Sequence, residues 1–319
     1  MLLKGKRALV VGLMNKYSLA AGVTQALLSG GASVVVSSKS PMNESHVKSC
    51  TFEIPKPSEI ASPTLHFEPC DVESDTSIEQ LMQRCGEVFN GELDILVHSV
   101  AFAPREAFAN GLLNTPRAAW TQAMDVSAYS LVALMKAAKP LMVQGVGERR
   151  DRSVLALTYA GSTKVNESKK WTLTVVNLLT ENVEKVVPNY NVMGPAKAAL
   201  EATARQLAYE LGPEGVRVNC ISPGPMNTVS ARGIPGISVS VGLCDERCRA
   251  EISLNNNVML QTMRKYAENH APLRRNSSSG DVGSVAAFLS SDLAASVTGQ
   301  TIYVDGGLSA MAPFAREEL

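Results

Sequence analysis

A tyrosine and a lysine seven positions apart, Tyr190 and Lys197, stand in the stretch PNYNVMGPAK. Seven residues make about two helical turns, so in a helix the two side chains would project from one face. The lysine charge could then lower the pKa of the phenol, while its ammonium hydrogen-bonds a nucleotide ribose. A phenol so placed can donate to a carbonyl oxygen that gains charge during hydride transfer. The alternative is an ordinary tyrosine and lysine on an amphipathic helix.

A second tyrosine, Tyr159, lies at the end of an apolar run in the stretch ALTYAGS. Continuous apolar runs of this length are typical of parallel strands that are covered on both faces. In open parallel sheets the ligand binds beyond the carboxyl ends of the strands. Tyr159 therefore stands where a catalytic side chain is expected.

Seven short apolar stretches predict the strands that would position these residues. They cover 7–12, 32–38, 65–72, 94–104, 153–162, 215–225 and 299–307. Helical patterns lie between them, for example at 127–142 and 196–212. The alternation predicts a single doubly wound parallel seven-stranded sheet (Rossmann-like) with helices on both faces, in one domain that spans 1–319.

The ends of the first three predicted strands offer contacts for a dinucleotide. Gly12 is followed by a helix that starts near Ser18, where free N–H groups suit a pyrophosphate, although a lone glycine here can also be a simple turn. Lys39 follows the second strand, and it is either a partner for a ribose 2′-phosphate or a solvated loop lysine. Asp71 and Val72 follow the third strand, where a carboxylate and a backbone N–H can hold an adenine edge.

Composition narrows the class of protein. The chain carries 30 basic and 30 acidic residues, and this balance argues against nucleic acid or an anionic membrane as the main partner. No apolar run approaches the roughly 20 residues of a membrane helix, and the first residues lead directly into a strand, so we expect no signal or transit segment. Six scattered cysteines, including Cys244 and Cys248, form no complete metal site, so we predict no metal and a reducing compartment such as the cytoplasm.

Several motifs together resemble the enoyl-[acyl-carrier-protein] reductases of the short-chain dehydrogenase/reductase superfamily. They are VGLMNKYSLAAGV at 11–23, CDV at 70–72, LVHSVAFAP at 96–104, DVSAYSLVALMKAA at 125–138, LTYAGS at 157–162, VPNYNVMGPAKAALEA at 187–202, GPEGVRVNCISPGPMNT at 212–228 and VTGQTIYVDGG at 297–307. The most specific element is the six-residue interval between Tyr190 and Lys197, because ordinary superfamily members have three residues there.

The resemblance implies that NADH or NADPH reduces a trans-2-enoyl thioester carried on acyl carrier protein, in type II fatty acid synthesis. It implies that Tyr190 hydrogen-bonds the thioester oxygen, that Lys197 holds the cofactor ribose, and that Tyr159 lines the acyl pocket. The implied cofactor contacts are Gly12, Ser18, Leu19, Lys39, Asp71, Val72, Val100, Lys197, Met226, Asn227, Thr228, Val229 and Ser230, and Ala103 is the implied substrate contact. A homotetramer is also implied.

The chain departs from the family pattern in two places. Thirty residues separate Tyr159 from Tyr190, far more than the family usually has, and the excess is an insertion at 166–186. The predicted substrate-covering loop at 229–266 is also extended, as in plastid-type relatives, so the plastid stroma is an alternative compartment. Basic residues in this loop, Arg247, Arg249, Arg264 and Lys265, suit either an acidic carrier protein or solvent.

Two other hypotheses for function remain open at this stage. A carbonyl reductase, acting on 3-ketoacyl thioesters, uses the same fold, although the interval between Tyr190 and Lys197 argues against it. An inactive dinucleotide-binding isoform is the other, because the insertion at 166–186 falls between two groups that must meet at one substrate.

Overall fold

The computed structural model describes residues 1–39, 50, 52–54, 63–108, 111–143, 151–159, 190–228 and 258–311. The predicted insertion at 166–186, most of the predicted covering loop, and Cys244 and Cys248 lie outside these ranges. The segment between the second and third strands is described only in part.

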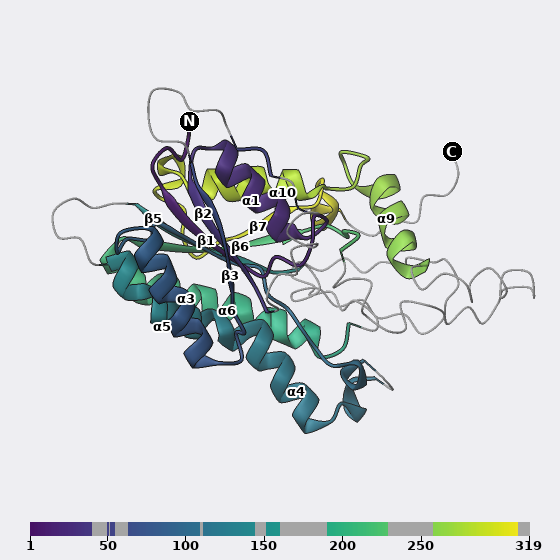
Figure 1. The fold of residues 1–319 in the computed structure, drawn as a ribbon. Coiled ribbons are helices and arrows are strands. Elements are labelled where there is room, and N and C mark those ends of the chain that lie inside the picture. Colours follow the sequence, from purple (N-terminus) through teal and green to yellow (C-terminus); the bar gives the residue numbers. More distant parts are fainter. Residues whose placement is uncertain are drawn as a thin grey trace, which may run out of the picture.

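The described residues form one parallel sheet of seven strands in the order β3-β2-β1-β4-β5-β6-β7, seen edge-on in Figure 1. The strands are β1 (Arg7–Val11), β2 (Ser33–Ser38), β3 (Leu65–Pro69), β4 (Ile95–His98), β5 (Arg152–Leu157), β6 (Val216–Pro223) and β7 (Thr301–Val304). Every neighbouring pair is parallel, with Val10 opposite Val36 on one side and Val97 on the other. The predicted fold is confirmed, although several strands end a few residues earlier than predicted.

Helices cover both faces of the sheet, as Figure 1 shows. Helices α1 (Leu19–Ser29) and α10 (Ser279–Leu289) lie on one face. The other face carries α3 (Asp75–Val88), α4 (Arg117–Met124), a π-helical turn (Asp125–Tyr129), α5 (Ser130–Val143) and α6 (Met193–Leu211), and α9 (Val258–His270) lies outside these layers. Short 3₁₀ helices occupy Arg105–Ala107, Leu112–Asn114, Gly212–Glu214, Asp292–Ala294 and Leu308–Ala310.

The core has two halves because successive side chains of a strand point to opposite faces. Leu9 and Val11 pack among the residues of α3, α5 and α6, whereas Ala8 and Val10 pack among those of α1 and α10. All four are at most 1% exposed. Continuous burial of this kind explains why β1 is apolar at every position from Ala8 onward, as expected for a parallel strand.

The crossing of α1 and α10 depends on two glycines that face each other. A Cβ added at Gly22 would lie 2.1 Å from the carbonyl oxygen of Ser279, and one added at Gly283 would lie 2.3 Å from that of Gly22. The helices therefore approach more closely than any side chain would allow. This contact brings the amino-terminal segment, which carries the predicted dinucleotide contacts, against the carboxyl-terminal part of the chain.

One continuous helical stretch, Arg117–Val143, is long and apolar enough to cross a membrane by length and composition. The prediction that no such stretch exists is therefore wrong. Just over half of its most apolar window, 56%, is buried inside the protein. Its apolar residues, among them Leu131, Leu134 and Met135, belong to the core beneath the sheet, and core helices of soluble proteins pass the same test.

Candidate active site

Tyr159 and Tyr190 meet at the carboxyl edge of the sheet, although thirty residues separate them in the chain. Tyr159 lies two residues after the end of β5, and Tyr190 lies three residues before α6. Their ring centroids are 5.4 Å apart with an interplanar angle of 60°, an edge-to-face arrangement that aromatic pairs favour. The two tyrosines predicted as catalytic are thus brought together by the fold.

Tyr190 is not part of the helix that carries Lys197, contrary to the prediction that both project from one helical face. The helix begins at Met193, and Asn191 has a left-handed backbone with φ of 42°. The Asn191 amide donates to the carbonyl oxygens of Phe108, at 3.1 Å, and Ala107, at 3.4 Å. Asparagine tolerates this conformation, and its side chain ties the turn to a neighbouring segment. The position of Tyr190 is therefore set by a tertiary anchor.

Lys197 lies in the first part of α6 and is only 5% exposed. Its ammonium donates to the carbonyl oxygen of Leu157, the last residue of β5, at 2.9 Å. This bond joins the lysine to the strand that ends just before Tyr159. Burial lowers the pKa of Lys197 to about 8, against the opposing influence of Cys220 and Glu201. Near neutral pH this lysine therefore carries a charge that it can lose at moderately higher pH.

The two phenols are held in their protonated form. Burial raises the pKa of Tyr159 to about 12, and it raises the pKa of Tyr190 further, with an added contribution from Tyr159. The expectation that Lys197 lowers the pKa of the phenol is wrong, because loss of water around the ring dominates. Both tyrosines are consequently hydrogen-bond donors at neutral pH.

A buried pair that the sequence analysis missed lies directly behind these residues. The Thr158 hydroxyl donates to the Glu201 carboxylate at 2.8 Å, and both residues are at most 3% exposed. Thr158 immediately precedes Tyr159, and Glu201 follows Lys197 by four residues on α6. Lysine and glutamate at this interval share one helical face, and that interval was the available signal.

The segment after β4 is fixed by the π-helical turn. Ser127 accepts from the backbone N–H of Phe102 and donates to its carbonyl oxygen, both at 3.0 Å. The next residue, Ala103, packs against a buried cluster that includes Val192, two residues after Tyr190. The predicted substrate contact thus lies against the segment that carries Tyr190. Single π-helical turns inside helices are frequent at functional sites.

Gly12 stands where the strand order reverses, between β1 and β4. Its φ is 108°, and an added Cβ would lie 2.2 Å from the carbonyl oxygen of Ser99 and 3.2 Å from Val100. Only glycine fits this close approach of two strand ends. Ser18 caps α1 by accepting from the N–H of Ala21 at 3.2 Å. A bare backbone followed by a capped helix start fits a dinucleotide pyrophosphate.

The remaining predicted cofactor contacts among the described residues lie along the same edge. Lys39 follows β2 and Asp71 follows β3, with the lysine ammonium 3.2 Å from the carboxylate. Val72 and Val100 pack against the α3, α5 and α6 side of the core, and Leu19 and Met226 pack against the other side. Asn227 and Thr228 continue the segment after β6, and Val229 and Ser230 lie outside the described residues.

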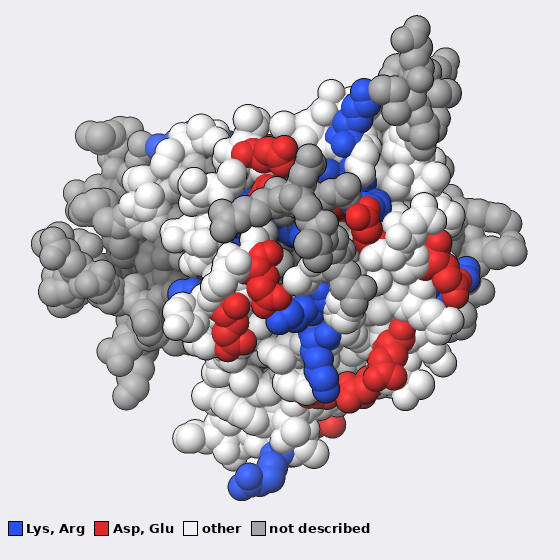
Figure 2. Space-filling model, turned by 90° about the vertical axis from the view of Figure 1, so that its left-hand side faces the viewer, with Lys and Arg blue, Asp and Glu red and all other residues white. Residues whose placement is uncertain are grey.

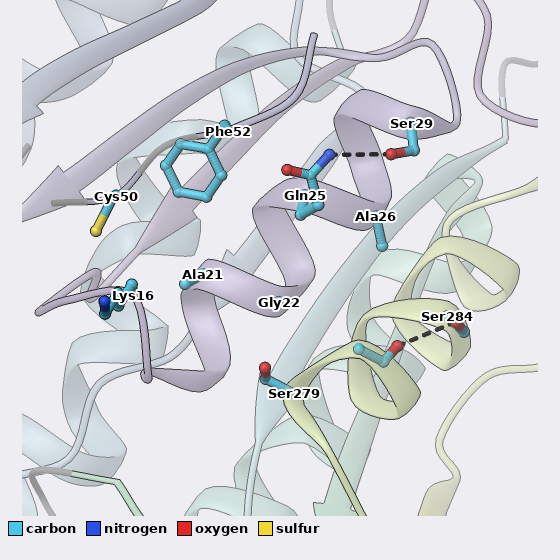
Figure 3. A pocket seen from close by; sticks show the side chains of 11 residues that line it. Lys16, Ala21, Gly22, Gln25, Ala26, Ser29, Cys50, Phe52, Ser279 and Ser284 are labelled. Carbon is cyan, nitrogen blue, oxygen red and sulfur yellow. Dashed lines mark hydrogen bonds between the residues drawn. The ribbon is translucent and has the colours of Figure 1, made fainter. Parts of the chain in front are cut away.

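A hollow of about 470 Å³ lies elsewhere, between α1 and α10 (Figure 3). Gln25 and Ser29 line it from α1, and Ser279 and Ser284 line it from α10. None of the residues predicted to bind cofactor or substrate lines this hollow. It is therefore separate from the candidate active site.

A family model described as "Enoyl-(Acyl carrier protein) reductase" matches the chain at residues 12–175, 172–258 and 238–309. The chain belongs to the enoyl-(acyl carrier protein) reductase family. A family member from Synechocystis sp., an enoyl-[acyl-carrier-protein] reductase [NADH], is 37% identical over 309 residues, which cover 97% of this chain and 98% of the relative.

Solved structures of the family have the same fold over nearly the whole chain. The Bacillus cereus enoyl-acyl carrier protein reductase, with NADP⁺ and indole naphthyridinone, is similar at a TM-score of 0.73 and 31% identity, covering 97% of this chain and 98% of the other. The reductase from Anaplasma phagocytophilum, with NAD, is similar at 0.72 and 30%, covering 98% and 96%. Family members are thus known with either dinucleotide.

Proposed function

We propose that the protein reduces trans-2-enoyl-acyl-carrier-protein thioesters to saturated acyl thioesters with NADH or NADPH, in fatty acid biosynthesis. The observation that carries the proposal is the contact between Tyr159 and Tyr190, with ring centroids 5.4 Å apart, beside the buried Lys197. Family membership supports the same reaction. The two tyrosines meet although thirty residues separate them in the sequence, and this argues against the inactive isoform.

The proposed cofactor contacts are those predicted from the sequence. Gly12 shows whether this edge of the sheet suits a dinucleotide. A Cβ at Gly12 would overlap the carbonyl oxygen of Ser99, so glycine is what lets the ends of β1 and β4 lie this close, at the strand-order reversal where doubly wound folds bind dinucleotides. Lys197 is the residue proposed to hold the nicotinamide ribose through its ammonium. When bound, the reduced nicotinamide supplies the hydride that the β-carbon of the enoyl group receives.

Tyr190 is proposed to donate its hydroxyl hydrogen to the thioester oxygen. As that oxygen gains enolate charge, the hydrogen bond strengthens, and this lowers the barrier more than it stabilises bound substrate. The raised pKa of Tyr190 keeps the donor hydrogen in place at neutral pH. Tyr159 is proposed to line the acyl pocket, and the edge-to-face contact fixes one ring against the other.

The proposed substrate carrier is acyl carrier protein, and the proposed assembly is a homotetramer. Large apolar side chains are exposed at several places: Trp120 on α4, Tyr129 on the π-helical turn, Phe288 on α10, Leu293 in a 3₁₀ helix and Tyr303 on β7. Exposed apolar side chains of this kind suit contacts between subunits. Among the described residues, acidic and basic side chains lie interspersed on the face in Figure 2, and they form no continuous basic surface there.

The cytoplasm is the proposed compartment. Four cysteines among the described residues, Cys50, Cys70, Cys85 and Cys220, are buried free thiols, and the relatives reported above are bacterial. Free thiols of this kind persist in reducing compartments.

A direct assay tests the reaction by following cofactor absorbance with crotonyl thioester and, separately, with acetoacetyl thioester. Oxidation of the cofactor with crotonyl thioester alone is the expected result. Oxidation with acetoacetyl thioester alone would instead identify a carbonyl reductase. Cofactor binding without turnover of either thioester would identify an inactive dinucleotide-binding protein.

A further inference from the structure

At the corner of the sheet where β2 and β3 end, a charged residue that follows one strand lies close to a charged residue that follows the other. Ser38 and Pro69 are paired at the last position of the two strands, and Lys39 follows the first of them directly. In doubly wound folds the residue at the end of the second strand faces the adenosine ribose, where NAD and NADP differ by a 2′-phosphate. What surrounds Lys39 therefore bears on the choice of dinucleotide.

Lys39 is engaged by two carboxylates. Its ammonium pairs with Glu73 and lies 3.2 Å from Asp71. Glu73 is held from two further directions, because its second carboxylate oxygen accepts from Gln122 on α4 at 2.8 Å and its N–H donates to Asp71 at 3.1 Å. These contacts hold Glu73 over the lysine.

The charge at this corner is negative. One ammonium faces two carboxylates, and Asp75 and Asp125 stand nearby on α3 and on the π-helical turn. The pKa of Asp125 is raised by burial first, and then by the negative charges of Glu73 and Asp75, so these groups sense one another. A ribose 2′-hydroxyl is neutral and tolerates this surrounding. A 2′-phosphate carries about two negative charges and would be repelled unless Lys39 were released.

We propose that Glu73 is a specificity-determining residue that occupies Lys39 and thereby favours NADH over NADPH. The inference rests on the proposed function, because it needs a dinucleotide at this edge of the sheet. It goes beyond family membership, since relatives of similar identity carry NADP⁺ in one structure and NAD in another. From its position alone, Lys39 could be either a partner for a ribose 2′-phosphate or a solvated loop lysine, and the carboxylate that pairs with it argues against the first.

The test is the equilibrium dissociation constant of each dinucleotide, measured by nucleotide fluorescence with no acyl substrate present. Glu73→Gln keeps the size of the side chain and its bond to Gln122 while removing the charge. We expect this variant to bind NADPH about tenfold more tightly and NADH within about twofold of the unmodified protein. Glu79→Gln is the matched control, because it removes the same charge from an exposed position on α3 and should change neither constant.

A second substitution tests whether the effect passes through Lys39. In the Lys39→Met, Glu73→Gln double variant the gain for NADPH should be largely lost, because no ammonium is left to meet the phosphate. Equal changes for both dinucleotides in Glu73→Gln, or a full gain without Lys39, would overturn the inference while leaving the proposed function in place. Failure of the unmodified protein to bind either dinucleotide would overturn both the inference and the proposed function.

Discussion

Two lysines lie at the carboxyl edge of the same sheet, in surroundings that differ sharply. Lys197 is 5% exposed and donates to a backbone carbonyl, whereas the side chain of Lys39 is 64% exposed and pairs with carboxylates. Burial lowers the pKa of Lys197 to about 8. The hydrogen bond that Lys39 donates to Glu73, and then the one that it donates to Asp71, raise the pKa of Lys39 despite some desolvation.

The difference shows how one residue type serves two purposes in a binding site. At the catalytic end, burial removes water from the ammonium of Lys197 and makes its charged form unfavourable. The protonation of Lys197 therefore responds to a bound ligand. At the ribose end, exposed ion pairs cost little to form or exchange, so they can discriminate between ligands without stabilising the fold much.

Tyr190→Phe should have the largest effect. Removing a hydrogen-bond donor aimed at a developing oxyanion lowers kcat by about 100- to 1000-fold, with a much smaller change in KM. Steady-state kinetics with crotonyl thioester measure both constants. Tyr209→Phe on α6, which removes the same hydroxyl from a side chain 79% exposed, is the control and should leave kcat unchanged. A normal kcat in Tyr190→Phe would remove the phenol from the mechanism.

Lys197→Met should change how stability depends on pH. Because the pKa of Lys197 falls from 10.5 to about 8 on folding, the unfolded chain binds more protons between these values, and stability rises with pH there. This group alone should raise the free energy of unfolding by about 3 kcal/mol across that window. Urea denaturation at several pH values should show this rise in the unmodified protein and not in the variant.

The same variant provides a second readout for the ribose role. Lys197→Met should weaken the binding of NADH, measured by nucleotide fluorescence. An unchanged dissociation constant would contradict the proposed contact, even if the pH dependence of stability changed as expected.

Glu201→Gln should shift the titration of Lys197. The carboxylate favours the charged lysine, so its removal should lower the pKa of Lys197, and the pH at which NADH affinity declines should fall. The amide oxygen can still accept from Thr158, which limits structural damage. Glu210→Gln, on the exposed part of the same helix, should leave the midpoint unchanged. An unshifted midpoint in Glu201→Gln would show that the carboxylate does not act on the lysine.

Lys39→Met should have the smallest effect on stability. Its raised pKa means that the ion pairs stabilise the protein below the ordinary lysine pKa and that this contribution is lost as pH rises through the higher folded value. Exposed pairs of this kind contribute less than about 1 kcal/mol, so urea denaturation at neutral pH should detect little change. A loss of stability as large as that from a core substitution would contradict the contrast drawn between Lys39 and Lys197.

Much of the fold was predictable from the sequence, and the site was predictable in part. Seven apolar runs gave the strands because a parallel sheet buries both faces of each strand. The tyrosine at the end of β5 and Gly12 at the end of β1 were found because strand ends gather at one edge. The prediction that Tyr190 and Lys197 share one helix was wrong, because Asn191 donates to the carbonyl oxygen of Phe108 and α6 begins only at Met193.

The order of the elements and the edge at which the site lies follow from local sequence patterns, since periodicity and strand ends are properties of short stretches of chain. The residues proposed to do the chemistry were identified by the resemblance of their motifs to those of the reductase family. Which groups meet depends on the folded chain as a whole: Tyr159 packs against Tyr190, Thr158 donates to Glu201, and Glu73 pairs with Lys39. Charge and pKa at each position follow from those meetings, because burial and neighbouring charges depend on segments far apart in the chain.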